Sequence, residues 1–400
     1  MRLLFIADGR SPIALNWIAG FTEQGDEVHL VSTYPCNPEL GLASLSINPV
    51  AFSRTRGEST GHAGSVSSKS WLAGGEGVRL RTVVRHWFGP FTIPSAARRL
   101  QKLVRDLRPD LVHAMRIPYE GMLAATALAN SPEIPLVVSV WGNDFTLHAP
   151  ATPWMGSNTR KSLLRADGLH TDCQRDLRLA RKWGFPGSRL AVVLPGNGGI
   201  RLDVFYPSQS KKNGQEYVIN PRGFRAYVRN DIFFRAVPLV LNARPGVRFI
   251  CPAMEGEGQA HRWLQEYGLT DKVDLLPKLT RAQMAELFRT ALVAISPSTH
   301  DGTPNTLLEA MACGCFPIAG DIESLHEWIT PGLNGLLVKP DDPRALSEAI
   351  LIALRSPELR EQAAHYNWKL VAERAEHHKV MREARKFYQK LVHEENRGSL

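Results

Sequence analysis

The chain has 400 residues, 44% of them hydrophobic and 22% charged, a composition typical of a folded globular protein rather than a disordered one. No apolar run comes near the ~20 residues that a membrane-spanning helix needs, and the five apolar residues after Arg2 are too few for a secretory signal, so we expect a cytoplasmic protein. The net charge of +9 is concentrated in residues 79–108, where eight basic residues accompany one acid, Asp106.

Short apolar runs alternate with helix-like stretches along the chain, which predicts parallel sheets covered by helices. The runs form two series, 3–7, 28–32, 111–114, 136–141, 168–171 and 190–194, then 217–220, 247–251, 273–276, 292–296 and 315–319. Each series predicts one doubly wound, Rossmann-like α/β domain. We expect these domains over residues 1–205 and 206–375, separated by the polar stretch 203–216, and a last helix over 376–400 that can pack back on the first domain.

Two segments of the first domain stand outside this alternation. Residues 54–77 are rich in Ser and Gly and predict a long loop. Residues 95–108 predict a basic helix with Ser95 as its N-cap and an apolar stripe made of Leu100, Leu103, Val104 and Leu107. Such a helix suits an anionic membrane surface on the cytoplasmic side or a phosphorylated acceptor, and it equally suits ordinary packing with a solvated basic face. No nucleic-acid motif accompanies it, so we expect no nucleic-acid partner.

The segment SPSTHDGTPNTLLEAMACG, residues 296–314, predicts a ligand site. It follows a strand, and Pro304 suits the first turn of a helix that ends at Gly314. The free N–H groups of Asn305, Thr306 and Leu307 would then form an anion site suited to a diphosphate. Glu309 lies on this otherwise apolar helix, where the two neighbouring hydroxyls of a ribose would be suitable partners. A carboxylate that reaches solvent or caps a loop is the alternative.

This segment carries a family resemblance. Asp301 and Glu309, with seven residues between them, resemble the E-x7-E signature of retaining glycosyltransferases of family 4. Residues 316–350 keep the family's order of elements, and LPGNGGIRLDVFYP, residues 194–207, is similar to its interdomain segment. The resemblance implies the GT-B fold, with two Rossmann-like domains facing each other across a cleft. It also implies that the C-terminal domain holds a nucleotide sugar and the N-terminal domain an acceptor.

The resemblance implies roles for residues of the second domain. Glu309 would bind the donor ribose, and Asp301 would contact the donor sugar at a position where the family usually has Glu. The diphosphate and sugar would be contacted by the turn Thr303, Pro304, Asn305, Thr306 and Leu307. The family's Arg–Lys pair, which neutralises the leaving diphosphate, is best matched by Arg225 and Arg229 in the loop after residues 217–220, with Arg222 and Gly223 as further donor contacts. A solvated basic loop is the alternative.

The first domain offers weaker matches. Arg10 and Ser11, in GRSPIA, match the family's first loop. His113 matches the first His of an H-x-H element whose second His is here Met115, so that Arg116 or Glu120 could substitute. Asp144, in WGNDF, matches a turn that holds cleft loops or acceptor hydroxyls. A structural His beside a strand and a simple turn at a strand end are the alternatives.

The sequence therefore predicts a retaining transferase that moves a sugar from a UDP- or GDP-sugar to a hydroxyl acceptor, either a saccharide or a lipid-linked one. We expect no cofactor and no metal, because no DxD motif is present and the five cysteines are scattered without a CxxC pair. A GT-B phosphorylase or epimerase remains an alternative, as does a non-catalytic carbohydrate- or membrane-binding protein. A nicotinamide-dependent dehydrogenase would need a glycine fingerprint that the chain lacks.

Overall fold

A computed structural model describes residues 1–53, 83–208, 214–225 and 227–398, with side chains up to residue 393. The loop expected at 54–77 lies outside these residues, as do Arg79 and Arg81. The chain divides into two compact units. The first contains residues 1–172, 176–198 and the segment from Met381 onward, and the second contains residues 173–175 and 199–380. The main borders between the units thus lie at 198/199 and 380/381, and the sequence predicted borders at 205/206 and 375/376.

The first unit is built on a parallel sheet that, in the described part of the chain, has seven strands in the order β3-β2-β1-β4-β5-β6-β7. The central strands are paired in register, with Phe5 opposite both Leu30 and His113. The strands are β1 (Arg2–Ala7), β2 (Glu27–Ser32), β3 (Ser44–Ile47), β4 (Leu111–Ala114), β5 (Leu136–Val140), β6 (Gly168–Thr171) and β7 (Leu190–Val193). The helices are α1 (Pro12–Thr22), α3 (Ile93–Leu107), α4 (Met122–Ala127), α5 (Pro153–Arg165), α6 (Gln174–Trp183) and α13 (His377–Gly398).

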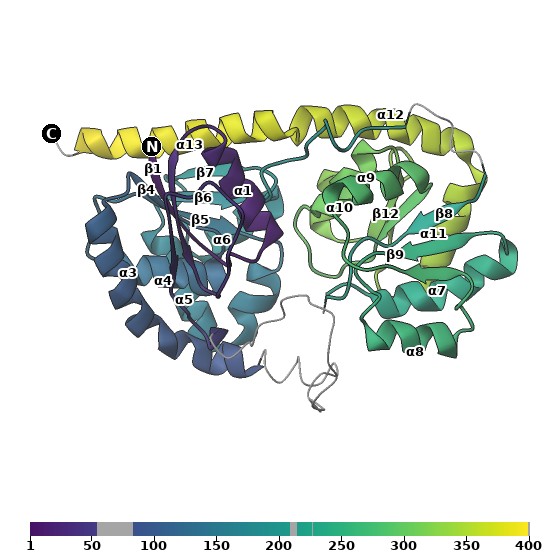
Figure 1. Ribbon diagram of the computed structural model, residues 1–400, viewed down its shortest axis with the longest axis horizontal. Coiled ribbons are helices and arrows are strands. Elements are labelled where there is room, and N and C mark those ends of the chain that lie inside the picture. The colour runs from purple at the N-terminus through teal and green to yellow at the C-terminus, as the bar shows by residue number, and fades with distance from the viewer. Residues whose placement is uncertain (54–82, 209–213, 226, 399–400) are drawn as a thin grey trace. The chain divides into compact units, whose positions relative to one another are not determined.

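The alternation of side chains along these strands separates two buried faces. Leu4, Ile6, Val112 and Val138 belong to an aliphatic core that includes residues of α3 and α4. The intervening residues, Phe5 and His113, lie on the other face. There they contact the rings of α1 and α13. Figure 1 shows the yellow α13 beside the purple α1 and β1.

Helix α13 completes the core of the first unit. The ring of Tyr388 stacks on Phe21 with centroids 4.7 Å apart, and Trp17 Nε1 donates a hydrogen bond to the Tyr388 hydroxyl at 3.0 Å. Glycines allow this close approach, because a Cβ on Gly20 would lie 2.6 Å from Met381 and one on Gly168 would lie 2.5 Å from Leu391. The last long helix is therefore an integral part of the first unit.

The second unit has a six-stranded parallel sheet in its described residues, in the order β10-β9-β8-β11-β12-β13. Its strands are β8 (Tyr217–Ile219), β9 (Arg248–Cys251), β10 (Val273–Leu275), β11 (Val293–Ser296), β12 (Phe316–Gly320) and β13 (Leu336–Val338). Its helices are α7 (Asn230–Ala243), α8 (Gly258–Glu266), α9 (Arg281–Thr290), α10 (Asn305–Ala312), α11 (Pro343–Arg355) and α12 (Pro357–Arg374). One core cluster contains residues of α7, α8 and α11, and the other contains residues of α9 and α10.

Most of the expected strands are confirmed within one or two residues, while β3 and β13 were not predicted. Helix α3 is also confirmed, with Leu100 and Val104 buried and Leu103 and Leu107 packed at the edge of the core. Its expected N-cap was wrong. The helix begins at Ile93, two residues before Ser95, and the Ser95 hydroxyl instead donates to the Thr92 carbonyl at 3.1 Å. Pro94 explains the shift, because proline suits the first turn of a helix, where its missing N–H leaves no bond unmade.

Candidate functional site

Both sheets have a topological switch point, which is where open α/β sheets bind ligands at the carboxyl ends of their strands. In the first sheet the chain order runs outward in opposite directions from β1 and β4, and in the second it does so from β8 and β11. The residues that follow these strands therefore define one candidate site in each unit.

In the second unit, an ion pair spans the switch point. Arg222 follows β8, Asp301 follows β11, and the Arg222 guanidinium donates to the Asp301 carboxylate. The same guanidinium donates to the Thr306 hydroxyl at 3.2 Å, at the start of α10. Arg222 is buried, and its Nε has no hydrogen-bond partner among the described residues. A cation, an acid and a helix N-terminus thus meet at one point of the sheet.

Hydrogen bonds join the two loops that carry this pair. The backbone N–H of Arg229 donates to the Pro297 carbonyl at 2.9 Å, and that of Thr299 donates to Tyr227 at 2.9 Å. Ser324 Oγ donates to the Asp301 carbonyl at 2.6 Å. Because both loops are bonded through their backbones, the ion pair is held on a rigid support rather than on free loop ends.

Helix α10 begins one residue later than expected, because Pro304 has extended backbone and precedes the helix. The N–H of Leu307 already donates to the Pro304 carbonyl at 3.0 Å, so the expected three free donors become two. Asn305 and Thr306 have N–H groups without an acceptor in the described chain, and Asn305 Oδ1 is buried without a partner. Gly314 ends the helix with φ +77°, as predicted.

Glu309 lies on α10 and is a half-buried residue. Burial raises its pKa to about 7, and the positive charges of Arg281 and Arg222 only partly oppose this shift. Within the described residues, the carboxyl has no hydrogen-bond partner. A carboxyl without a partner at a half-buried residue is costly in a resting protein and suits a ligand that brings its own hydroxyl donors.

The two expected cations of the loop after β8 lie differently from Arg222. Arg229 forms a bidentate pair with Asp231, with distances of 2.8 and 2.7 Å. Arg225 is exposed and donates to the Tyr227 hydroxyl at 3.0 Å. Gly223 has φ +60°, a left-handed conformation that favours glycine and lets the chain turn after Arg222. The structure therefore brings Arg222, rather than Arg225 or Arg229, into contact with Asp301.

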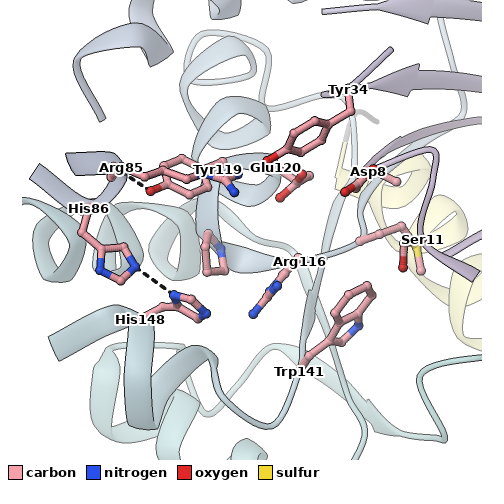
Figure 2. Close-up of a pocket in the computed structure, with 13 residues that line it drawn as sticks. Asp8, Ser11, Tyr34, Arg85, His86, Arg116, Tyr119, Glu120, Trp141 and His148 are labelled. Atoms are coloured by element: carbon pink, nitrogen blue, oxygen red, sulfur yellow. Dashed lines mark hydrogen bonds between the residues drawn. The ribbon is translucent and has the colours of Figure 1, made fainter. Parts of the chain in front are cut away.

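The first unit contains a cavity of about 260 Å³ at the carboxyl ends of β1, β2, β4 and β5 (Figure 2). Three of the sequence-predicted residues, Ser11, Arg116 and Glu120, line it. The full lining is Ala7, Asp8, Ser11, Tyr34, Arg85, His86, Met115, Arg116, Pro118, Tyr119, Glu120, Trp141 and His148.

Arg116 and Asp144 are coupled at this cavity. Arg116 Nε donates to the buried Asp144 carboxylate at 2.8 Å, and its other end donates to Asn143 at 2.6 Å. The second oxygen of Asp144 accepts the N–H of Trp141 at 3.1 Å. Asp144 does not line the cavity itself. It holds the turn after β5 and orients Arg116, whose guanidinium carbon lies 5.4 Å from the Trp141 ring centroid.

Glu120 provides a buried carboxyl to the cavity. Its Oε1 accepts a hydrogen bond from the Thr33 hydroxyl at 2.7 Å. Burial raises its pKa, although that hydrogen bond and the charge of Arg85 act in the opposite direction. The neighbouring Tyr119 has φ +69°, unusual for a bulky residue, and such backbone strain is concentrated at functional sites.

Arg10 and Ser11 begin the first loop. Ser11 is the N-cap of α1, where its hydroxyl accepts the N–H of Ala14 at 3.5 Å. Arg10 forms a bidentate pair with Asp8, both distances 2.9 Å, and its guanidinium stacks 3.6 Å from the Tyr34 ring centroid. Arg10 therefore supports Asp8 and Tyr34 from behind and does not itself line the cavity.

His113 lies in the core of the first unit and does not reach the cavity, contrary to the expected site role. It has no exposed surface, and burial together with the nearby His170 holds its pKa well below the usual range. Both ring nitrogens are used, one by Tyr388 and the other by Ser139 at 2.7 Å. The expectation was wrong because His113 is a buried strand residue whose ring faces α1 and α13. The residues that reach the cavity, Arg116 and Glu120, follow the end of β4.

The hydrogen bonds of His113 belong to a buried chain with one consistent direction. Trp17 can only donate, so the Tyr388 hydroxyl donates in turn to His113. The neutral His113 then donates to Ser139, Ser139 donates to His170 at 2.8 Å, and His170 donates to the Leu194 carbonyl at 2.9 Å. Burial lowers the pKa of His170 to about 4, which agrees with this neutral assignment. The expected catalytic histidine is thus part of a structural network.

The two halves of the chain match two family models. Residues 9–196 match one described as "Glycosyl transferase 4-like domain", and residues 205–369 match one described as "Glycosyl transferases group 1". Each half of the chain is thus similar to a glycosyltransferase domain.

Curated relatives that the chain resembles include the D-inositol 3-phosphate glycosyltransferases of Streptomyces avermitilis and Mycolicibacterium smegmatis. The first is 25% identical over 60% of this chain and 52% of its own length. The second is 29% identical over 45% of each. The chain thus matches about half the length of these relatives.

Solved structures confirm the GT-B fold. Sucrose-phosphate synthase from Thermosynechococcus elongatus is similar with a TM-score of 0.73 and 16% identity, over 98% of this chain and 99% of that one. Anabaena HepE, solved in complex with UDP, is similar with a TM-score of 0.69 and 14% identity, over 98% of this chain and 100% of that one. The two parallel α/β units of this chain thus have the expected fold.

Several residues of the cavity in the first unit were not predicted from the sequence, among them Tyr34, Trp141 and Arg85. Tyr34 lies two residues past β2, and Trp141 lies one residue past β5. Their place just beyond strand ends was a usable signal, because both strands adjoin the switch point. Arg85 had no such signal, since it lies in a short helical stretch, residues 83–88, next to residues outside the described chain.

One group of potential metal ligands lies in the described residues. It consists of Asp172, Cys173 and Asp176, whose ligand atoms are within 4.8 Å of one another. Two acids and a thiol in this arrangement are common without an ion, and both acids have further partners. The expected independence of metal therefore stays a prediction.

Proposed function

We propose that this protein is a retaining glycosyltransferase that moves a sugar from a nucleoside diphosphate sugar, UDP- or GDP-linked, to a hydroxyl acceptor. The observation that carries the proposal is the meeting of Arg222, Asp301 and the start of α10 at the switch point of the second sheet. The two family models support the same class of donor, as does the similar fold of HepE, a protein solved in complex with UDP.

The donor roles follow from the charges at this point. The free N–H groups at the start of α10 and the orphaned Nε of Arg222 are suited to a diphosphate. The carboxyl of the half-buried Glu309 is suited to ribose hydroxyls, and Asp301 to a sugar hydroxyl. Fixed cations stabilise the leaving diphosphate without a metal, and the departing phosphate itself could take the acceptor proton from the same face. Retention at the anomeric carbon and independence of metal are part of this proposal.

A ligand panel tests the proposal directly. Thermal unfolding would be followed with UDP, GDP, ADP and their glucose conjugates, with and without EDTA. A cognate nucleotide at 100 times its Kd stabilises the fold by about 2.7 kcal/mol, which raises the melting temperature by a few degrees. We expect one base to stand out, with no effect of EDTA. No response to any nucleoside diphosphate would contradict the proposal.

The products separate transfer from the related chemistries. With the donor identified, labelled sugar would be traced in the presence and absence of a saccharide acceptor. Transfer to the acceptor with retained configuration supports the proposal, whereas a sugar phosphate formed from added phosphate or a free epimer would contradict it. Arg222→Lys should lower turnover far more than it lowers the melting temperature, because lysine keeps the charge beside Asp301 but lacks the planar fork of donors. Near-normal turnover in this variant would remove the Arg222 guanidinium from the proposed role.

We also propose that an anionic membrane surface is a partner. Trp87, Phe88, Phe91 and Trp154 are each at least 48% exposed, and the Phe91 and Trp154 rings lie 5.7 Å apart. Three of these aromatic residues, Trp87, Phe88 and Phe91, lie in the segment directly before α3. The exposed side of α3 and its C-terminal end carry basic residues, namely Arg98, Arg99, Lys102, Arg105 and Arg108. Aromatic rings next to a basic helix suit the boundary between lipid headgroups and acyl chains. In the described chain, no helix is long and apolar enough to cross a bilayer.

A further inference from the structure

The cavity of the first unit contains a cation, Arg85, that forms no ion pair with any described residue. Two nearby arginines have carboxylate partners, Arg10 with Asp8 and Arg116 with Asp144. The Arg85 Nε is buried and has no hydrogen-bond partner in the part of the chain that the structure describes. An orphaned donor on a half-buried guanidinium is a cost that a bound anion would remove.

Aromatic rings hold Arg85 in place. Its guanidinium carbon lies 4.4 Å from the Tyr119 ring centroid and 5.5 Å from that of Tyr34. The Tyr119 hydroxyl donates to the Arg85 carbonyl at 2.8 Å, so ring and backbone are fixed together. Stacking of this kind orients a guanidinium and leaves its edge N–H groups available for a phosphate. The strained backbone of Tyr119, with φ +69°, keeps this ring under Arg85.

Two histidines lie beside Arg85 at the same end of the cavity (Figure 2). His86 Nε2 and His148 Nδ1 are 3.0 Å apart and share one hydrogen. The other ring nitrogen of His86 remains outside this bond. Asp8 and Ser11 lie at the opposite side of the view, with Glu120 and Arg116 between the two ends. The cavity thus has a cationic end with histidines and an end with carboxyl and hydroxyl groups.

The end near Asp8 suits a polyol. Carboxylates accept hydrogen bonds from sugar hydroxyls, and the ring of Trp141 can cover an apolar sugar face. Trp141 Nε1 is buried without a partner in the described residues, so one indole donor is also left to a ligand. A volume of about 260 Å³ accommodates one sugar ring and a small charged group.

We propose that this cavity binds an acceptor that is itself a phosphate ester, a sugar or polyol whose phosphate is held by Arg85 beside His86 and His148. The inference rests on the proposed function, because it assigns the cavity of the first unit to the acceptor. The same phosphate chemistry is offered by a free sugar phosphate and by the headgroup of an inositol lipid.

Direct binding tests the inference without any transfer reaction. Calorimetry on the full chain would compare matched pairs: D-glucose 6-phosphate with D-glucose, and glycerol 3-phosphate with glycerol. We expect the phosphorylated member of at least one pair to bind at least tenfold more tightly. Arg85→Gln should abolish this preference, whereas the matched control Arg262→Gln, an exposed arginine on α8, should keep it. Equal binding within every pair, or an unchanged preference in Arg85→Gln, would overturn the inference.

Two further arms keep the result interpretable. An unchanged melting temperature and circular dichroism spectrum report that Arg85→Gln is folded. UDP binding, which we assign to the second unit, separates the proposals, because a phosphate preference without nucleotide binding would contradict only the proposed function. Vesicles of phosphatidylcholine with phosphatidylinositol, compared with equal phosphatidylserine, distinguish the sources. An Arg85-dependent excess on inositol lipid identifies a headgroup, and a response to soluble phosphates alone identifies a free sugar phosphate.

Discussion

Glu309 shows how one carboxyl can make nucleotide binding depend on pH. Its pKa is raised to about 7 by burial, so in the ligand-free protein the carboxylate form grows as the pH rises through 7. Ribose hydroxyls donate stronger hydrogen bonds to the carboxylate than to the protonated acid. The folded state also binds more protons than the unfolded state between pH 4.5 and 7, so this group lowers the stability of the ligand-free protein as the pH rises through that window.

We therefore expect UDP or GDP affinity to increase severalfold between pH 6 and 8, measured by calorimetry. Glu309→Gln should bind less tightly at pH 8 and show a flatter profile. Because the ionisation of the nucleotide phosphate affects both proteins equally, the difference between the two profiles isolates Glu309. Parallel profiles would show that its carboxyl does not contact the nucleotide.

At the scale of single residues, the sequence predicted which loops lie together at the donor site, but it did not predict which side chains contact each other there. Asp301 and Arg222 were both expected at the donor site, and the structure joins them directly. Arg229 was favoured by spacing, yet Asp231, two residues further on, takes its guanidinium. Spacing cannot rank neighbouring arginines, because the choice depends on which local acid each side chain reaches. His113 was misassigned for a related reason, since the alternation along β4 does not say which face is covered by a helix 275 residues later.

Among the elements, α13 contributes one buried hydroxyl, that of Tyr388, to the hydrogen bonds that stabilise the first unit. Tyr388 accepts from Trp17 and donates to His113, all three side chains being buried. Tyr388→Phe keeps the ring on Phe21 but leaves two buried groups without a partner. We expect a loss of about 1–3 kcal/mol in unfolding free energy, measured by urea denaturation. Tyr366→Phe, on an exposed side of α12, is the matched control and should change little. A loss below about 0.5 kcal/mol would argue against the hydrogen-bond chain.

Helix α3 is the element that should bind membranes. Replacing Arg98, Lys102 and Arg105 with Gln keeps the buried stripe and removes three exposed charges, each worth about 1 kcal/mol near an anionic surface. We expect at least tenfold weaker sedimentation with phosphatidylglycerol vesicles and an unchanged melting temperature. Binding of the unsubstituted protein should also fall as salt rises. Binding that is indifferent to salt, or equal for both proteins, would exclude this role.

The elements themselves were the most predictable part of the chain. Buried strands such as β1 and β5 are continuous apolar runs bounded by polar turns, and their ends were placed closely. β3 was not predicted because its sequence, SLSI, is short, half-exposed and at the edge of the sheet. β13 was not predicted because its three residues directly follow a glycine-rich turn. Edge strands bury less surface, so their sequences carry less of the apolar signal.

On the scale of the whole molecule, the two switch points assign ligands to separate units. Each unit has its own cores and its own candidate site. Hydrogen exchange with saturating UDP or GDP should therefore slow amides of residues 214–231 and 296–309 in the second unit. The strands β1, β2 and β4 of the first unit should keep their exchange rates. Protection confined to the first unit would contradict the assignment of the nucleotide.

The composition of the first unit has a consequence for synthesis on the ribosome. Its sheet and α1 are made first, but Tyr388 and the rest of the segment from Met381 emerge only after the whole of residues 199–380. At ~5–20 residues per second, that delay is roughly 10–40 s. During this time α13 does not yet cover Phe21 and Gly168, and the indole N–H of Trp17 has not yet met its acceptor, the Tyr388 hydroxyl. The nascent first unit should therefore be a substrate for chaperones until its last helix arrives.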